Sequence, residues 1–338
     1  MATDRNRLVS TLSTAGATCA VGMLVLSGCA SDRAPGAGSA TAHPLESRIW
    51  SVREGVFIDD EELVGRLTAA DQVLLGEIHI NPDHHRLQER LIGEFTERDL
   101  RPAIVFEIFE RDQQPAIDAA RSAPQPDPDQ LAEATGVMDS GWDWPDYRPL
   151  VAQALRDGLP IVAGNAPAAD MRKVGMQGLD ALPADRRALL EQTGPLPAPA
   201  HDALTQTIVD SHCGHVTGDM ADRLVVAQRL RDATMADAML TADGRPTVLI
   251  AGAGHARRDY GVPFYVLARQ PGLAVASVSF VEVRDGHLDP QAYVDQIETL
   301  PAPFDYLWFT SRVLADDPCE QFKDSFKKFG EHAGRSED

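Results

Sequence analysis

Two short segments place a glycine three residues before a histidine, each directly after an apolar run. Gly76 precedes His79, with Glu77 between them, and Gly252 precedes His255. The spacing alone is a weak signal in a chain with 26 Gly and 10 His. The position of the two motifs after apolar runs is informative, because the functional sites of open α/β sheets lie at the carboxyl ends of their strands. We expect each glycine to permit a tight exit from its strand and each histidine to project into a crevice.

Further carboxylates and imidazoles crowd the first segment. His84 and His85 fall in the first turn of a helix predicted after Asn81-Pro82, and Glu107 follows an apolar run at 103–106. Such groups at one edge can ligate a metal, act as general acid and base, or hold a polar group of a cofactor. Alternatively, the two histidines lie exposed on the helical turn, and Glu107 is a structural carboxylate that binds backbone amides.

The segment 141–148 (GWDWPDYR) is the most aromatic stretch in a chain with 6% aromatic residues. One interpretation is that at least one tryptophan packs the following helix onto the sheet. The other is a flat apolar wall for a planar ligand, with Tyr147 as a phenolate ligand and Arg148 as the partner of an anion.

A second group of possible ligands lies at 211–215 (SHCGH). His212 and His215 are three residues apart and share one face if the segment is helical. Cys213 and His215 could bind a soft metal, although a closed zinc site needs four ligands. Alternatively, Cys213 forms a disulfide with Cys319, or it is buried and inert.

Apolar runs alternate with amphipathic segments along the chain. The predicted strands are 73–75, 103–108, 160–163, 247–251 and 273–281, and the predicted helices include 82–98, 146–157 and 218–240. Continuous apolar runs are typical of strands buried on both faces of a parallel sheet. We therefore predict an α/β fold, a mostly parallel β-sheet flanked by helices, with a smaller helical subdomain at 164–245.

The N-terminus is typical of a bacterial lipoprotein. Residues 1–28 form a predicted signal peptide, with Arg5 and Arg7 before an uncharged apolar stretch that ends Leu-Ser-Gly at 26–28. Cys29 is the predicted lipidation site, followed by a flexible tether at 29–47. The main domain is expected at 48–315 and a polar tail at 316–338. This arrangement predicts an extracytoplasmic protein, lipid-anchored to a bacterial membrane.

The composition excludes some classes of protein. The 338 residues carry a net charge of −20 with no evident basic cluster, which argues against nucleic acid as a partner. Four cysteines are too few for a disulfide scaffold.

Several motifs, in order along the chain, resemble the ChaN family of bacterial haem-binding lipoproteins linked to iron uptake. They are GEIHINPDHHRLQ (76–88), FEIFERDQQPAID (106–118), WPDYRPLVAQAL (144–155), VAGNAP (162–167), AQRLRDATMADAML (227–240) and LIAGAGHARRDYGVPFYVL (249–267). The resemblance implies a parallel-sheet α/β domain with a smaller helical domain, and a homodimer that holds a pair of stacked haems. An outer-membrane haem receptor is a further expected partner.

The resemblance also implies iron ligation by a tyrosine, an anionic ligand that suits ferric haem. Tyr147 is the first candidate and Tyr260 the second. A histidine is expected near the propionates, with His79, His84 and His85 as the candidates. Because propionates are anionic and the chain is acidic, local positive charge is needed, for which the candidates are Arg148, Arg257 and Arg258.

Two functions follow from these observations. The first is a membrane-anchored protein that binds haem, in haem or iron uptake. The second is a metal-dependent hydrolase, because the family belongs to a wider group that shares paired Gly-x-x-His motifs with erythromycin esterases and Tiki-type metalloproteases. In that alternative the catalytic residues are Glu77, His79, Glu107 and His255, and a divalent metal is held by His79, His255 and Glu77.

Overall fold

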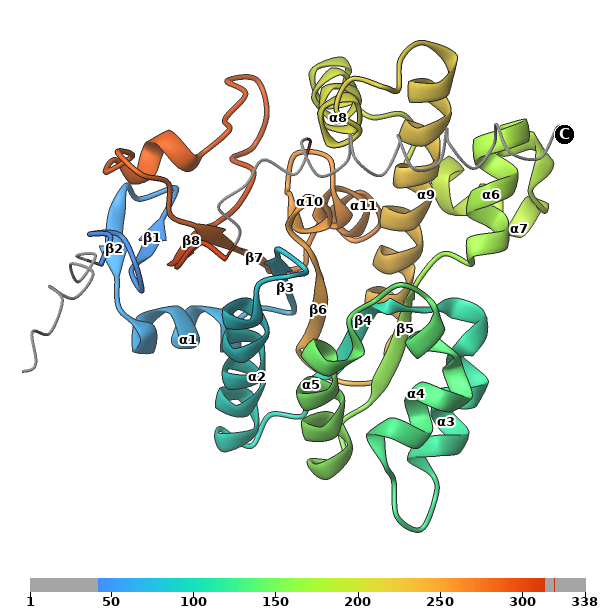
Figure 1. Ribbon diagram of the computed structural model, residues 1–338, viewed down its shortest axis with the longest axis horizontal. Coiled ribbons are helices and arrows are strands. Elements are labelled where there is room, and N and C mark those ends of the chain that lie inside the picture. The colour runs from blue at the N-terminus through green and yellow to red at the C-terminus, as the bar shows by residue number, and fades with distance from the viewer. Residues whose placement is uncertain (1–41, 314–318, 320–338) are drawn as a thin grey trace, which may run out of the picture. The chain divides into compact units, whose positions relative to one another are not determined.

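The predicted parallel sheet is present in the computed structural model, which describes residues 42–313 and Cys319. Within this part of the chain, one eight-stranded sheet has the order β2-β1-β8-β7-β3-β6-β4-β5 (Figure 1). The six strands from β8 to β5 in this order run parallel to one another, whereas β1 is antiparallel to β8 and to β2. The strands are β1 (Ile49–Ser51), β2 (Val56–Ile58), β3 (Gln72–Glu77), β4 (Ala103–Glu110), β5 (Ile161–Asn165), β6 (Thr247–Gly252), β7 (Val275–Glu282) and β8 (Tyr306–Thr310).

The central strands are buried on both faces. In β3, Val73 and Leu75 join one hydrophobic cluster, while Leu74 joins another on the opposite face of the sheet. Strand β6 repeats this alternation, with Ile250 on the first face and Leu249 on the second. This double burial explains why the sequence shows continuous apolar runs in place of an alternating pattern.

Helices cover both faces. The helices are α1 (Asp60–Thr68), α2 (Pro82–Glu97), α3 (Gln114–Arg121), α4 (Pro128–Thr135), α5 (Trp144–Arg156), α6 (Ala168–Gln177), α7 (Ala184–Glu191), α8 (Ala198–Ser211), α9 (Asp219–Thr241), α10 (Ala253–Ala256) and α11 (Val262–Arg269). Helices α1 to α5 pack on one face, where α2 and α5 lie side by side, and α9 to α11 pack on the other (Figure 1).

The predicted start of α2 is confirmed. Pro82 is the first helical residue, and the side chain of Asn81 accepts a hydrogen bond of 3.0 Å from the backbone N–H of Asp83. Asn81 also donates to Glu282 Oε1 at 2.8 Å, which ties the helix start to the end of β7. The cap and this bond fix where the first turn of α2 lies relative to the sheet.

Four helices, α6 to α9, form the chain between β5 and β6, as predicted for 164–245. Strand β5 continues to Asn165 before they begin. The turn after α8 carries Cys213, which forms a disulfide with Cys319, so one of the three alternatives for this cysteine is confirmed. Among the helices of the described residues, none is both long and apolar enough to cross a membrane.

The predicted fold class is confirmed, while three strands were not predicted. These are β1, β2 and β8, which form one side of the sheet and are three to five residues long. The predicted signal peptide, Cys29 and most of the tether and tail lie outside the described residues, so the domain boundaries stay predictions.

Candidate functional site

The site lies where β3, β6 and β4 end side by side. Glu77, the last residue of β3, is in register with Gly252, the last residue of β6. On the other side of β6, Phe106 of β4 pairs with Ile250, so the next residue, Glu107, reaches the same edge. After β6 the chain passes over β3 to form β7 on its other side, and open α/β sheets place their sites at such changes of strand order.

Glu77 is the centre of one hydrogen-bonded group. Its buried carboxylate accepts from Tyr147 Oη and from Gln88 Nε2, the second at 2.6 Å. His79 Nδ1 lies 2.9 Å from Glu77 Oε1, and His85 Nδ1 lies 3.3 Å from Glu77 Oε2. The side chain of His79 is 42% exposed, so it is the member of this group that solvent or a ligand can reach. Burial lowers the pKa of His79, but the Glu77 contact outweighs it and raises the pKa overall.

Glu107 is the centre of a second, buried group. It accepts from the backbone N–H of Gly252 at 2.8 Å and from Arg231, and His255 Nε2 lies 3.2 Å away. The other ring nitrogen of His255 lies 2.5 Å from Asp232 Oδ1. Burial alone would raise the pKa of Glu107, but His255 and Arg231 hold it well below its ordinary value. The structural role considered for Glu107, binding a backbone amide, is therefore present.

The two charges that flank His255 determine its protonation. Burial disfavours the charged ring, but Glu107 and Asp232 together raise the pKa of His255 to about 9. Burial raises the pKa of Asp232, whose second oxygen, Oδ2, is buried without a hydrogen-bond partner. The carboxylates of Glu107 and Asp232 therefore alternate with the positive groups of Arg231 and His255 in one compact cluster beneath the sheet edge.

The glycines of the two motifs permit close packing. The predicted tight exit is present at Gly252, where β6 ends and α10 begins at the next residue, but it does not depend on a left-handed glycine. Neither has a positive φ. A Cβ on Gly76 would lie 2.8 Å from the Cβ of Ala256 and 2.9 Å from the Cα of Ala253, on the helix that crosses β3. A Cβ on Gly252 would lie 2.9 Å from His79 Cε1. The second glycine thus lets the histidine of the first motif approach β6.

His84 and His85 are both buried, which excludes the alternative that they lie exposed on the helical turn. His84 Nδ1 accepts from the backbone N–H of Ile78 at 2.8 Å, and its Nε2 lies 2.8 Å from Thr310 Oγ1. Burial lowers the pKa of His84 to about 4. His85 Nε2 lies 2.9 Å from the backbone oxygen of His79. The two rings support the loop that carries His79, and their assignment to haem stays a prediction.

The aromatic segment lies over His79. The ring of Trp142 meets that of His79 edge to face at 4.8 Å and that of Tyr147 at 5.8 Å. Trp144 packs in the core with its indole N–H bonded to Asp129, so the packing role predicted for at least one tryptophan is confirmed. Tyr147 is buried and donates to Glu77, and burial and that carboxylate both raise the pKa of its phenol.

The second candidate tyrosine, Tyr260, lies in a different cluster. It is buried against α8, where its hydroxyl lies 3.1 Å from Thr207 Oγ1, and burial raises its pKa. The guanidinium of Arg257 lies over its ring at 4.6 Å. The structure therefore keeps Tyr147 beside His79 and Tyr260 apart from it.

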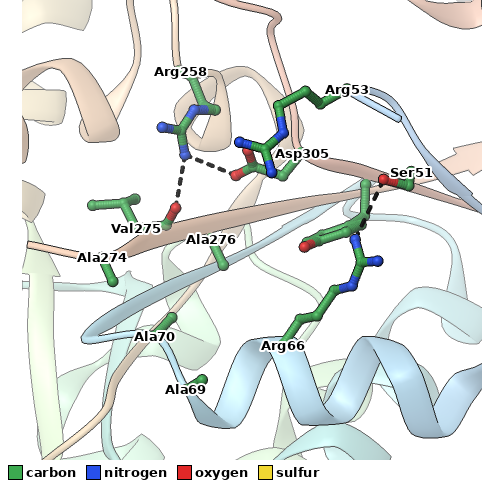
Figure 2. Close-up of a pocket in the computed structure, with 11 residues that line it drawn as sticks. Ser51, Arg53, Arg66, Ala69, Ala70, Arg258, Ala274, Val275, Ala276 and Asp305 are labelled. Atoms are coloured by element: carbon green, nitrogen blue, oxygen red, sulfur yellow. Dashed lines mark hydrogen bonds and ion pairs between the residues drawn. The ribbon is translucent and has the colours of Figure 1, made fainter. Parts of the chain in front are cut away.

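The three candidate arginines are not brought together in one basic patch, because each is paired with a carboxylate in its own place. Arg148 binds Asp129 through two nitrogens, and the buried Arg257 binds Asp259 in the same way. Arg258 bonds to Asp305 at 2.7 Å and lines a separate pocket of about 450 Å³ near the start of β7 (Figure 2). The anion-binding roles of Arg148 and Arg257 stay predictions.

The predicted divalent-metal site finds no support. Among the described residues, no group of three or more His, Cys, Asp or Glu side chains is arranged to hold a metal ion. Here Glu77 and Glu107 bond instead to hydrogen-bond donors and imidazoles.

A cavity of about 440 Å³ opens beside Arg231, between α6, α8 and α9, and we call it the α6–α9 cavity. Met171, Ile208, Leu224 and Ala227 form its apolar walls. Its polar lining includes His212, Arg172 and Gln228, and Gln228 Nε2 lies 3.1 Å from His255 Nδ1. The cavity therefore adjoins the buried group around Glu107.

The sequence interpretation missed Gln88, Gln228, Arg231 and Asp232, although all four contact the candidate site. Asp232 and Arg231 lie within one of the motifs quoted for the family resemblance, at 227–240. Their signal is an Arg-Asp pair at the start of a mainly apolar stretch on a long helix, where 232–236 are all buried. A buried charge in such a segment requires a partner.

These features define an α/β protein with a polar site at the carboxyl edge of a mainly parallel sheet. Residues 63–266 match the family described as haem-binding uptake, Tiki superfamily, ChaN. Because the match covers more than half of the chain, the protein belongs to this family. No curated protein matches the chain at a significant level.

Several solved structures are similar to this chain, and the first of these shows the same fold. ChaN of Campylobacter jejuni, described by its cofacial haem binding, is 20% identical with a TM-score of 0.61, over 77% of this chain and 95% of that one. An erythromycin esterase variant, EreC, in its open conformation is 13% identical with a TM-score of 0.38, over 82% and 86%. The type III effector HopBA1 is 12% identical with a TM-score of 0.38, over 74% and 92%.

Proposed function

We propose that this protein is a membrane-anchored lipoprotein that binds haem for haem or iron uptake. Its membership of a family described as haem-binding uptake carries the proposal. The Campylobacter jejuni protein of similar fold binds haem cofacially, so we propose that this chain also forms a homodimer holding a pair of stacked haems. The anchor is a lipid on Cys29, and the partner that delivers or takes haem is an outer-membrane receptor.

The size and lining of the α6–α9 cavity suit the ring and the propionates of a haem. Ligand pockets of roughly 300–1,000 Å³ are mainly apolar with a few placed polar groups, and this cavity has that size and character. Haem has an apolar ring and two anionic propionates. The apolar walls suit the porphyrin ring, and the guanidinium groups of Arg172 and Arg231 suit the anionic propionates. The charge of Arg172 is available for this role, because Arg172 has no ion-pair partner among the described residues. Haem bound here would supply iron as cargo.

A titration of the full chain with ferric haem, followed by absorbance, tests the binding. We expect a saturable change with one haem per chain and a dimer in sedimentation. Absorbance that matches free haem at every ratio would refute the proposal. For the anchor, Cys29→Ala should release the protein from the membrane fraction, and retention there would refute the lipoprotein assignment.

The hydrolase alternative is supported by one observation. His79 Nδ1 is held 2.9 Å from the buried carboxylate of Glu77, while the side chain remains 42% exposed. A carboxylate that orients an accessible imidazole is an arrangement used in general base catalysis. Hydrolysis of ester probes that is lost in His79→Ala would support this function. Equal, background rates for both proteins would exclude it for those probes.

A further inference from the structure

We propose that the pocket of about 450 Å³ at the start of β7, which we call the β7 pocket, binds a phosphate monoester. Its lining includes the side chains of Arg53, Arg66 and Arg258. Strands β7 and β8 begin at this pocket, whereas the site around Glu77 lies where strands of the same direction end. The inference therefore concerns a separate site and does not depend on the proposed function.

The three arginines reach the β7 pocket from separate segments of the chain (Figure 2). Arg53 lies in the turn between β1 and β2, Arg66 in the last turn of α1, and Arg258 between α10 and α11. The backbone N–H of Val52 bonds to the backbone oxygen of Asp305 at 3.0 Å, which holds the turn of Arg53 against the start of β8. In a chain with a net charge of −20, this lining is a local concentration of positive charge that attracts an anion.

Among the described residues that line the pocket, Asp305 is the one carboxylate, and it already has partners. Its Oδ2 accepts from Arg258 Nη1 at 2.7 Å and from the backbone N–H of Ser277 at 2.8 Å. Arg258 also donates to the backbone oxygen of Val275 through the same Nη1, so its Nη2 has no hydrogen-bond partner in the described part of the chain. Arg258 can therefore hold Asp305 and donate to a ligand at the same time.

Arg53 supplies the positive charge that is least compensated. Its side chain is exposed and has no ion-pair partner among the described residues. Arg66 is bonded to Glu54 at 2.8 Å and to Glu62, but the side chains of these glutamates are 36% and 46% exposed. Because such surface ion pairs contribute little, an anion that enters the pocket can compete for Arg66.

The charge of the lining suits a phosphate monoester better than a carboxylate. The three guanidinium groups exceed the single carboxylate by two positive charges. A phosphate monoester carries about −1.5 to −2 charges at pH 7, whereas a carboxylate carries one. The planar guanidinium group also forms paired hydrogen bonds with phosphate oxygens.

Small residues leave room in the pocket for the organic part of the ester. Four alanines belong to the lining, namely Ala69, Ala70, Ala274 and Ala276. The half-buried ring of Tyr306 adds apolar surface, with the guanidinium carbon of Arg66 lying 5.8 Å from its centre. The phosphate can belong to a small soluble ester or to the headgroup of phosphatidic acid.

Isothermal titration calorimetry of the full chain with glycerol 3-phosphate tests the soluble ester. We expect Arg53→Ala to weaken binding roughly tenfold, because a charge-assisted contact is lost. Arg121→Ala is the matched control, since Arg121 also has no ion-pair partner among the described residues but does not line the pocket. An equal loss of affinity in both variants would overturn the proposal.

A second variant fills the pocket without changing its charge. Ala274 is exposed, so Ala274→Leu should fold as the wild type does and weaken binding by occupying the space. Unchanged affinity in this variant would overturn the placement of the ligand.

Cosedimentation with phosphatidylcholine vesicles, with and without phosphatidic acid, tests the lipid as the source of the phosphate. The full chain with Cys29→Ala is used, so that the predicted anchor does not itself bind the vesicles. Binding that requires phosphatidic acid and falls in Arg53→Ala would support the proposal with a lipid headgroup as the ligand. A protein that binds neither glycerol 3-phosphate nor these vesicles would overturn it.

Discussion

His255 and Asp232 form a buried pair beneath the sheet edge, with His255 Nδ1 lying 2.5 Å from Asp232 Oδ1. The helix that carries Asp232, α9, also lines the α6–α9 cavity through Ala227, Gln228 and Arg231. The pair therefore links the motif after β6 to the wall of the proposed haem site. We expect a change in the charge of the His255–Asp232 pair to alter the stability of the folded protein before it alters ligand binding.

The stability of the protein should fall as pH rises above neutrality. The folded state raises the pKa of His255 to about 9, above the ordinary value of about 6.5. The stabilisation from its charge is complete below about pH 6.5 and is lost as pH rises through about 9, on the order of 1–3 kcal/mol. Urea unfolding across this range should show the loss in the wild type and a smaller slope in His255→Gln. Equal slopes would contradict the assigned charge.

Gly252→Ala should displace His79. The new Cβ would lie 2.9 Å from His79 Cε1, so the ring must move away from Glu77. Since the Glu77 contact raises the pKa of His79, we expect the pKa of that ring to fall toward its ordinary value in an NMR titration. Gly254→Ala is the matched control, because a Cβ there has no neighbour within 4 Å. An unshifted His79 titration in Gly252→Ala would show that the close approach has no effect.

The disulfide should stabilise the protein substantially. It links residues 106 apart in the sequence, and such links typically contribute about 2–4 kcal/mol by restricting the unfolded chain. We expect Cys319→Ser to lower the free energy of unfolding by that amount. A reducing agent should bring the wild type to the level of the variant and leave the variant unchanged. A wild type that is insensitive to reduction would mean that the link contributes nothing.

Arg172→Glu should weaken haem binding by placing a negative charge beside the propionates. Because Arg172 is exposed, we expect a loss of roughly tenfold at most, decreasing as salt is added. Lys173→Glu makes the same change of charge on the next residue, which does not line the cavity. An equal loss in both variants would indicate a general effect of net charge and not a contact in the cavity.

The sequence predicted most of the central sheet because its strands are buried on both faces. The segments 103–106 and 248–251 contain no polar residue, as expected of strands that are buried on both faces. The edge strands β1, β2 and β8 are short, and a segment such as Ile49–Ser51 gives too few positions to show a period. Their pairing depends on contacts between distant segments, which local patterns do not contain.

The candidate site was partly predictable for a similar reason. Glu77 ends β3, His79 and His255 follow β3 and β6, and Glu107 comes directly after the last residue of β4 that pairs with β6, so a parallel sheet brings all four to one edge. Asp232 lies in the middle of a helix, where its burial depends on packing against β6 and α11. The orientation of His212 depends on the C-terminal cap of α8, whereas local sequence patterns give only its spacing from His215.

The most direct test of the account is a crystal structure of the full chain with ferric haem, with the iron located by anomalous scattering. The account predicts an iron peak in the α6–α9 cavity, beside Arg231. An iron peak beside Tyr147, or crystals grown with haem that contain no iron peak on the protein, would contradict it.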